Sequence, residues 1–379
     1  MNVVIAIDSF KGSLTSLEAG QAAAEAIKAV EPQSQVHVFP VADGGEGTVD
    51  ALTEGLGGEI VATEVTGPLG QVVASRYGYI PGTDAAVIEM ADAAGLTMVP
   101  EYERNPMNTT TYGLGELILH AARDKGCRDF IIGIGGSATN DCGLGMLTAL
   151  GVKFYREDGR PTGIFGRDLA AVERIDMSGM APILRECRIR VACDVTNPLT
   201  GPNGCSAVYG PQKGATPAII EQMDSYIDRF AGIAQRDLGV TGAELPGAGA
   251  AGGLGFAFHA FLGAELKPGV ELVLDAIGID GALYDADLLL TGEGRIDSQT
   301  AMGKAPVGIA ELAKKRNPRV RTVAVCGCAR DDATAVNDHG IDAYFPIIHQ
   351  SMSVEESMEK ATALRNLKQT VTQIIRLVR

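Results

Sequence analysis

Short apolar runs alternate with stretches of helical periodicity at the start of the chain. Residues 3–7 form a continuous apolar run, which is typical of a parallel strand covered on both faces. Thr15 and Glu18 have the spacing of a capping box, and the apolar positions after them recur at helical spacing until Pro32. Residues 36–39 predict a second strand. We therefore expect the chain to begin with a βαβ unit.

The end of the chain repeats this pattern. Strands are predicted at residues 287–290, 320–326 and 343–348, with helical stretches between them. Ser353 and Glu356 form another capping box, and the apolar positions that follow predict one long amphipathic helix. Together the two ends supply the five strands of a flavodoxin-like, doubly wound parallel sheet.

The middle of the chain has a different pattern. Short turns alone separate three predicted strands, which suggests an antiparallel meander at residues 59–65, 72–80 and 86–90. A helix and two further strands are predicted at residues 109–125, 130–134 and 189–193. We therefore expect a discontinuous flavodoxin-like domain, residues 1–57 and 280–379, interrupted by an inserted α/β domain with a mixed sheet, residues 58–279.

Charge and composition narrow the class of protein. Asp and Glu outnumber Lys and Arg by 47 to 32, which gives a formal net charge of −15. A surface this acidic repels nucleic acids and anionic lipids, so we expect neither as a partner. No apolar stretch approaches the roughly 18 residues of a membrane helix, and the N-terminus lacks a basic signal-peptide region. A cytoplasmic protein is therefore expected, and seven cysteines without CxxC spacing indicate reduced thiols.

The topology predicts where a ligand would bind. Open parallel sheets bind ligands beyond the carboxyl ends of their strands, where the strand order reverses. In the order 2-1-3-4-5 this point lies between the first and third strands, next to loops at residues 8–13 and 291–297. In the first loop, Gly12 permits a tight turn, Lys11 adds positive charge, and helix-opening amides can face a phosphate. The alternative is a solvated turn that caps the helix.

Two further segments carry charge beside glycine. Glu293, Arg295 and Asp297 alternate along a loop that also holds glycines, and this density of charge favours a functional site over a solvated loop. Asp43 follows the second predicted strand and precedes Gly44 and Gly45. It is placed to hold magnesium or to orient a hydroxyl, and its alternative role is to cap the next helix.

The insert holds a motif that favours a rival function. Residues 133–138 follow a predicted strand and match the G-x-G-x-x-A dinucleotide fingerprint, with Asp158 downstream at the expected spacing. The polar residues after the fingerprint would cap a helix or line a hydroxy-acid site. Asp194 follows another strand, and Lys213 lies in a segment that we expect to open a helix, although turn chemistry alone explains both.

Missing motifs exclude several enzyme classes. There is no GxxxxGK[ST] P-loop, no HRD or DFG of protein kinases, no GxSxG elbow and no HExxH zinc motif. The five histidines are dispersed along the chain. A P-loop kinase, a protein kinase, an α/β-hydrolase and a zincin are therefore not expected.

Eight sequence blocks together resemble the type 1 glycerate kinases. In chain order they are DSFKGSLTS at 8–16, PVADGGEGT at 40–48, TGPLG at 66–70, GIGGSATND at 133–141, CDVTNPLTGPNG at 193–204, YGPQKGAT at 209–216, GAAGGLG at 249–255 and LLTGEGRIDSQTAMGKAP at 289–306. The resemblance implies ATP-dependent phosphorylation of D-glycerate with magnesium, giving 2-phosphoglycerate in bacterial members. It also implies a flavodoxin-like domain interrupted by a second α/β domain.

Chemical roles can be placed on the matched motifs, with the site expected in the cleft between the domains. Lys11, Asp43, Arg295 and Asp297 are the candidate catalytic residues, and Asp8, Glu293 and Asp297 are the candidate ligands of Mg²⁺. The candidates for contact with substrate or nucleotide are Ser9, Gly12, Ser13, Gly44, Gly45, Gly135, Gly136, Ser137, Asn140, Asp141, Asp194, Lys213, Gly292 and Glu293.

Alternatives stay open at this point. One rival is a dehydrogenase that binds NAD at residues 133–138, and another is a non-catalytic sensor of sugar acids or nucleotides. The residues alone leave open whether position 2 or position 3 of glycerate is phosphorylated, which carboxylate is the base, and whether the chain forms a homo-oligomer.

Overall fold

A computed structural model of the chain describes residues 1–45 and 47–379, so Glu46 of the predicted Asp43 motif lies outside the described residues. The chain divides into two compact units. Unit 1 comprises residues 1–43, 50–57 and 270–379, and unit 2 comprises residues 44–49 and 58–269. The last boundary falls earlier than the predicted 279/280. Val270 belongs to unit 1 because it packs closely on helix α11 (Ala305–Arg316), where a Cβ on Gly308 would lie 2.9 Å from its side chain.

The sheet of unit 1 has the predicted flavodoxin-like order. Its strands run β13-β12-β11-β1-β2, and all neighbouring pairs are parallel. Their bounds are Asn2–Ile7 for β1, Gln35–Val38 for β2, Leu288–Ile296 for β11, Arg321–Ala329 for β12 and Ala343–Pro346 for β13. In chain order this is 2-1-3-4-5, with the switch point between β1 and β11.

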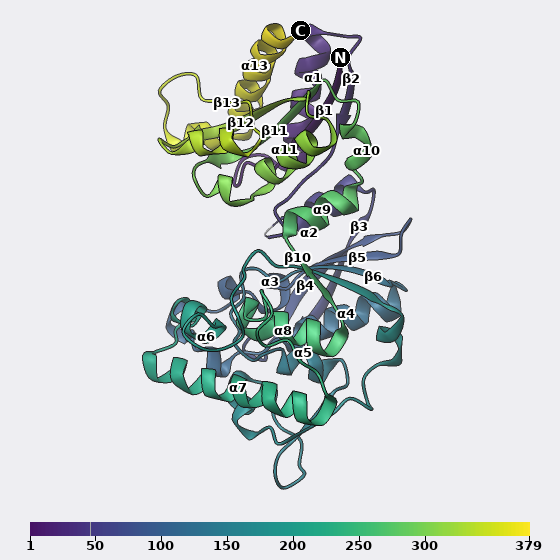
Figure 1. Ribbon diagram of the computed structural model, residues 1–379, viewed down its shortest axis with the longest axis vertical. Coiled ribbons are helices and arrows are strands. Elements are labelled where there is room, and N and C mark those ends of the chain that lie inside the picture. Colours follow the sequence, from purple (N-terminus) through teal and green to yellow (C-terminus); the bar gives the residue numbers. More distant parts are fainter. Residues whose placement is uncertain (46) are drawn as a thin grey trace. The chain divides into compact units, whose positions relative to one another are not determined.

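Helices cover both faces of this sheet. On one face, α1 (Ser16–Val30) and α13 (Lys360–Val378) lie side by side and pack on β1, β11 and β12 (Figure 1). On the other face, α11 (Ala305–Arg316) packs on β11 and β12. Shorter helices are α2 (Thr48–Gly55), which begins at a unit boundary, α9 (Gly269–Ile277) and α10 (Asp280–Leu283).

The capping boxes at Thr15 and Ser353 are confirmed, but the prediction of one long C-terminal helix is wrong. Each cap hydroxyl accepts from the amide three residues later, and each glutamate accepts in return. The second box opens only α12 (Val354–Met358), because Glu359 has a non-helical ψ of 126°. α13 begins after this break.

Unit 2 is built on a six-stranded mixed sheet, as predicted. The order is β10-β9-β6-β5-β4-β3, with antiparallel pairs among β3, β4 and β5 and parallel pairs beyond. The bounds are Glu59–Thr66 for β3, Val72–Ile80 for β4, Ala85–Glu89 for β5, Asp129–Gly133 for β6, Arg188–Ala192 for β9 and Glu265–Lys267 for β10. A small hairpin joins β7 (Lys153–Tyr155) to β8 (Arg174–Asp176).

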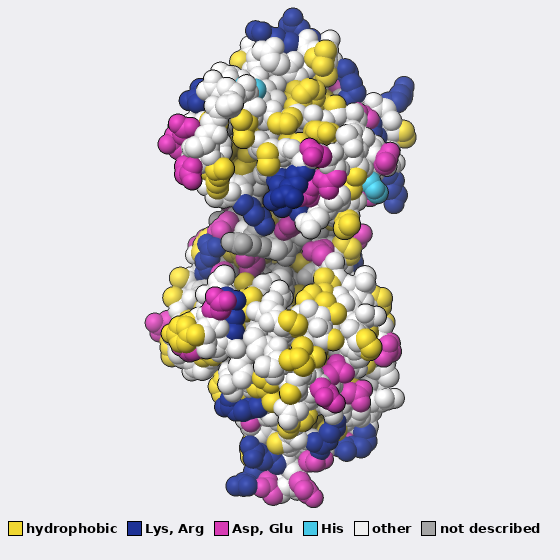
Figure 2. Space-filling model, turned by 90° about the vertical axis from the view of Figure 1, so that its left-hand side faces the viewer, with side chains coloured by type: hydrophobic (Ala, Val, Ile, Leu, Met, Phe, Trp, Pro, Cys, Tyr) yellow, Lys and Arg dark blue, Asp and Glu magenta, His cyan; other side chains and the backbone are white. Residues whose placement is uncertain are grey.

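The helices of unit 2 enclose one large apolar core with this sheet. They are α3 (Ala91–Ala94), α4 (Tyr112–Asp124), α5 (Leu144–Ala149), α6 (Cys205–Tyr209), α7 (Pro217–Leu238) and α8 (Ala250–Leu262) (Figure 1). The first turn of α8 is irregular, because residues 251–253 have left-handed backbone angles. No helix among the described residues is both long and apolar enough to cross a membrane. On the face shown in Figure 2, basic side chains lie beside acidic ones in both units.

Candidate active site

The register of β1 and β11 brings two acidic residues of unit 1 together. Ile7 pairs with Gly292, and the amide of Asp8 donates to the Gly292 carbonyl at 2.8 Å. Asp8 therefore leaves β1 beside Glu293. A Cβ on Gly292 would lie 2.0 Å from the Val325 carbonyl oxygen, so this glycine allows the close approach of β12.

The predicted loop at residues 291–297 is largely a strand. β11 runs on to Ile296, because Glu293 and Arg295 pair with Cys326 and Cys328 of β12 beyond the end of β1. Glu293 and Arg295 thus stand on a two-stranded ribbon that extends from the sheet. A paired strand holds these side chains more rigidly than the expected glycine loop would.

Asp8 is a buried carboxylate next to other carboxylates. Its side chain is 7% exposed, and its Oδ1 accepts from the amide of Ser9 at 2.6 Å. Burial and, to a lesser extent, the nearby charges of Asp43 and Glu293 together raise the pKa of Asp8 to about 7, while the Ser9 hydrogen bond and the charge of Lys11 oppose them. A cation near this group would favour the ionised carboxylate.

Glu293 and Asp297 share one buried threonine. Thr300 Oγ1 donates to Glu293 Oε1 at 2.6 Å and accepts from the amide of Asp297 at 3.2 Å. Burial raises the pKa of Glu293, against which the Thr300 hydrogen bond acts. Asp297 Oδ2 accepts from Arg295 Nε at 3.1 Å, and its Oδ1 accepts from the amide of Gln299. Both carboxylates are held in place, and the Arg295 side chain is half exposed.

The segment after β1 forms a tight loop with an exposed cation. Gly12 has a φ of 78°, and the amides of Ser13 and Leu14 both donate to the Phe10 carbonyl. Lys11 is exposed at the tip of this loop. The Oγ of Ser13 is a buried hydroxyl without a hydrogen-bond partner among the described residues. The loop therefore offers a charge and a hydroxyl for an anion.

Asp43 is partly buried at the end of the segment that follows β2. That segment is tied to β1 through Ser16, whose Oγ donates to the Ile7 carbonyl at 2.6 Å and accepts from the Val41 amide at 2.8 Å. This link brings Asp43 into the electrostatic neighbourhood of Asp8 and Glu293. Unit 1 thus collects four of the predicted acidic residues.

Sequence reasoning missed three contributors to this cluster. Ser16 links two strand ends, Thr300 bridges two carboxylates, and the positive charge of Lys304 acts on Glu293. Thr300 and Lys304 lie inside the motif at residues 289–306, and Gly303 directly precedes the lysine. Position within that motif was the signal that could have found them.

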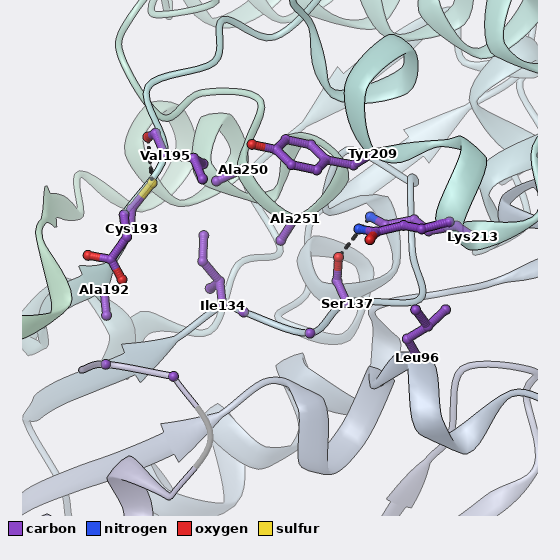
Figure 3. Close-up of a pocket in the computed structure, with 16 residues that line it drawn as sticks. Leu96, Ile134, Ser137, Ala192, Cys193, Val195, Tyr209, Lys213, Ala250 and Ala251 are labelled. Atoms are coloured by element: carbon purple, nitrogen blue, oxygen red, sulfur yellow. Dashed lines mark hydrogen bonds between the residues drawn. The ribbon is translucent and has the colours of Figure 1, made fainter. Parts of the chain in front are cut away.

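Unit 2 holds a pocket of about 360 Å³ (Figure 3). This volume lies in the usual range of small-molecule sites, about 300–1,000 Å³. Seven of the predicted site residues line this pocket, and they are Gly44, Gly45, Gly135, Gly136, Ser137, Asp194 and Lys213. Apolar walls come from side chains such as Ile134, Val195 and Ala251, and polar groups include Tyr209 and Gln212.

Lys213 is the pocket's buried cation. It is 2% exposed, and its Nζ donates to Ser137 Oγ at 2.8 Å (Figure 3). The same Nζ donates to the Thr139 carbonyl at 2.5 Å. Burial lowers the pKa of Lys213 to about 8. The expectation that this segment opens a helix is wrong, since Pro211–Lys213 is a single 3-10 turn and α7 begins later, where Thr216 caps it.

Asp141 and Asn140 are held inside unit 2 and do not line the pocket. Asp141 is fully buried and accepts from the amide and hydroxyl of Thr111 and from the amides of Gly143 and Gly145. Its geometry is that of a structural cap. Asn140 Nδ2 donates to Ser206 Oγ at 2.9 Å, while its Oδ1 is buried without a partner among the described residues.

The glycine segment after β6 is not built like a dinucleotide site. In the fingerprint, a helix starts at the glycines and its N-terminus faces the pyrophosphate. Here residues 134–143 are irregular, and α5 begins only at Leu144. Asp158 forms an exposed ion pair with Arg160. The observed geometry therefore argues against the NAD interpretation.

The acidic cluster of unit 1 suits magnesium. Mg²⁺ prefers oxygen ligands and is commonly held by one or two carboxylates together with substrate phosphates. Within residues 1–45 and 47–379, no group of three or more His, Cys, Asp or Glu side chains is arranged to hold a metal alone. Burial, followed by the nearby carboxylates, raises the pKa of Asp8, so a cation would favour its ionised form.

Comparison with known proteins decides the family. The profile of the glycerate kinase family matches residues 3–379. The chain belongs to the glycerate kinase family. A glycerate kinase of Halalkalibacterium halodurans is 47% identical over 362 residues, 96% of this chain and 94% of the relative. The glycerate 2-kinase of Escherichia coli K12 is 45% identical over 376 residues, 98% of each chain.

A solved structure agrees with this assignment. A crystal structure of a Salmonella typhimurium LT2 protein, assigned as glycerate kinase 2, superposes with a TM-score of 0.91 at 46% sequence identity. The match covers 100% of this chain and 98% of the other. The predicted membership of the glycerate kinase family is confirmed, and with it the interpretation as a kinase rather than a dehydrogenase.

Proposed function

We propose that this member of the glycerate kinase family transfers the γ-phosphoryl group of ATP to the 2-hydroxyl of D-glycerate. The oxygen of that hydroxyl forms a bond to the γ-phosphorus, the bond from this phosphorus to the β,γ-bridging oxygen breaks, and the hydroxyl proton is released. The products are 2-phosphoglycerate and ADP. The observation that carries the proposal is the cluster of buried carboxylates at the switch point of the unit 1 sheet.

Phosphate groups of the nucleotide would bind at the loop after β1. Lys11 is exposed there and supplies a positive charge, and the buried Ser13 hydroxyl supplies a donor that the protein itself leaves unused. The amide of Gly12 is a further candidate donor, whereas the amides of Ser9 and Ser13 already donate to Asp8 Oδ1 and to the Phe10 carbonyl. Arg295 has a half-exposed planar fork that suits either the γ-phosphate or a carboxylate.

One or two of Asp8, Glu293 and Asp297 would hold Mg²⁺ together with phosphates of the nucleotide. All three side chains are less than 10% exposed, and burial together with mutual repulsion raises the pKa of Asp8 and of Glu293. A bound Mg²⁺ would neutralise part of the negative charge of the carboxylates and of the phosphates. The rigid β11–β12 ribbon and the Thr300 hydrogen bonds keep these oxygens oriented.

Asp43 is our candidate for orienting the 2-hydroxyl. Phosphoryl transfer passes through a loose transition state that asks little of a strong base, so position should matter more than basicity. The residues named in this scheme all belong to unit 1, and the expectation of a site between the domains stays a prediction.

An ADP-release assay tests the proposal directly. ADP should form only when D-glycerate, ATP and Mg²⁺ are all present, and excess chelator should abolish its formation. Activity that persists in chelator would remove the metal from the scheme. Glycerate-dependent change in nicotinamide absorbance would support the dehydrogenase, and thermal stabilisation by glycerate without ADP release would support the sensor.

A further inference from the structure

Unit 2 buries the positive charge of Lys213 without an ion pair to any acidic side chain that the structure describes. Within the described residues, no carboxylate lies within ion-pair distance of Lys213 Nζ, whose protein partners are the Ser137 hydroxyl and the Thr139 carbonyl. An ammonium group has three N–H donors, so these two bonds leave one for a ligand. A buried charge is costly unless it is paired, which makes an anionic ligand the natural complement.

The charged side chains that line the pocket favour an anion with a single negative charge. Of the described residues that line it, Lys213 is the one cation and Asp194 is the one carboxylate. Asp194 is partly occupied, because its Oδ1 accepts from the Gly269 amide at 2.8 Å. A triphosphate with several negative charges would meet a single ammonium and a repelling carboxylate. A monoanionic hydroxy acid matches better, because a carboxylate accepts hydrogen bonds from hydroxyls.

We propose that the unit 2 pocket binds the organic acid substrate, with Lys213 donating to its carboxylate and Asp194 accepting from a hydroxyl. This assignment rests on the proposed function and deepens it. The substrates are then divided between the units, with the acid in unit 2 and the metal-bound phosphates of the nucleotide at the carboxylates of unit 1.

The apolar walls are consistent with a carboxylate at this lysine. Ile134, Val195 and Ala251 line the pocket and lower the local dielectric, so a charge-assisted hydrogen bond to Lys213 is strengthened. Ser137 and the Thr139 carbonyl fix the position of the ammonium. The site is therefore preorganised for one small anionic group.

The first test is the substitution Lys213→Met, which keeps the length of the chain and removes the charge. We expect the glycerate KM and the Kd from calorimetry to rise about 10- to 100-fold, the value of a charge-assisted hydrogen bond. The KM for Mg-ATP should change less than about twofold. Lys153→Met is the matched control, because Lys153 is an exposed lysine of the same unit, and it should leave both constants unchanged.

A neutral analogue tests the contact without relying on the variant alone. D-glyceramide carries an amide in place of the carboxylate. Its inhibition constant with the wild-type protein should be about 10- to 100-fold higher than the KM of glycerate. Lys213→Met should not weaken glyceramide further, because the carboxylate contact is already missing. Comparing both proteins with both ligands therefore isolates the interaction between the Lys213 ammonium and the ligand's carboxylate.

Three results would overturn the assignment while leaving the kinase function intact. One is a rise in the Mg-ATP KM with the glycerate KM unchanged, which would give the pocket to the nucleotide. Another is glyceramide binding as tightly as glycerate to the wild-type protein, a result that does not depend on folding of the variant. The third is unchanged glycerate affinity in both folded Lys213→Met and Ser137→Ala. Loss of the proposed function itself would appear instead as no ADP release by the wild-type protein.

Discussion

The two units bury charges of opposite sign. Unit 1 gathers Asp8, Glu293 and Asp297 at the carboxyl ends of parallel strands, where burial raises the pKa of Asp8 and of Glu293. Unit 2 buries Lys213 in a pocket with apolar walls, where burial lowers the pKa of this ammonium group. Among residues 1–45 and 47–379, neither Asp8 nor Lys213 forms an ion pair with an oppositely charged side chain. Our proposals therefore match each buried charge with a ligand of opposite sign, a cation with its phosphates in unit 1 and a small anion in unit 2.

A buried but satisfied charge provides the contrast. Asp141 is as buried as Lys213, yet it accepts four hydrogen bonds from Thr111, Gly143 and Gly145. Burial alone therefore does not mark a ligand site in this protein. Asp8 and Lys213 are also buried, but their side chains make fewer hydrogen bonds to the described residues than Asp141 does, one for Asp8 and two for Lys213.

The largest expected effect comes from Asp8→Asn. We expect kcat/KM to fall about 10³-fold, because the substitution removes a charged ligand of the metal-phosphate group. The same substitution should increase the stability of the folded protein at pH 8 when a chelator removes the metal. A carboxyl whose folded pKa is raised from 3.8 to about 7 stabilises the fold at low pH and loses this contribution as the pH rises through 7.

The melting temperature checks the expected increase in the stability of Asp8→Asn at pH 8. Asn cannot ionise, so Asp8→Asn should melt a few degrees higher than the wild-type protein at pH 8, by about 2 °C or more. Asp331→Asn, at an exposed aspartate of unit 1, is the control and should change neither quantity. Reduced stability at pH 8 would mean that Asp8 is a structural residue.

Lys11→Ala should lower kcat by about 10²-fold with almost no change in melting temperature. The lysine is exposed on the loop after β1, so it contributes little to folding, while its charge would face the transferring phosphate. Lys315→Ala, at an exposed position of α11, is the matched control. Normal turnover by folded Lys11→Ala would remove this loop from the phosphate site.

The pH dependence of glycerate binding sharpens the contrast between the units. Only the protonated form of Lys213 can pair with a carboxylate, so the glycerate Kd should rise about tenfold per pH unit above about 8. The nearby charged groups are Asp141, Asp194 and the thiol of Cys205, and burial raises the pKa of that thiol to about 11. Calorimetry between pH 7 and 10 measures the effect. A flat profile would contradict the contact, and glyceramide should give a flat profile as the control.

The smallest effect is expected from Arg295→Lys. Lysine keeps the charge but loses the planar fork, so we expect a loss in kcat/KM of about five- to tenfold. A raised glycerate KM would indicate contact with the carboxylate and would weaken the division of substrates, whereas a lower kcat would indicate γ-phosphate. Arg319→Lys, at an exposed arginine, is the control. Wild-type constants for Arg295→Lys and also for Arg295→Ala would leave this residue as a solvated charge.

Periodicity and capping were sufficient to predict the fold of unit 1. The apolar runs gave all five strands, and their order follows from the doubly wound topology. The break at Glu359 was not predictable, because helical spacing continues across it and one backbone angle interrupts it. The extension of β11 was not predictable either. Its glycines and charged residues are typical of a loop, and only the pairing with β12 makes this segment a strand.

Local sequence showed which residue types could form a site, but tertiary contacts determine what each does. Asp141 and Asp194 both come after strands of unit 2, yet Asp141 accepts hydrogen bonds from Thr111 of a distant segment, while Asp194 lines the pocket. Lys213 had weak support in the sequence because its burial comes from packing. Such differences arise between residues far apart in the chain, and no local pattern encodes them.

Phosphorus NMR of the product tests the central claim most directly. With D-glycerate, ATP and Mg²⁺, we predict that the γ-phosphate signal of ATP is lost and that a phosphomonoester signal appears together with ADP. A phosphate on carbon 2 couples to one proton and gives a doublet, whereas a phosphate on carbon 3 couples to two and gives a triplet. A doublet is the predicted result. A triplet would contradict transfer to the 2-hydroxyl, and the absence of any phosphomonoester would contradict the kinase function itself.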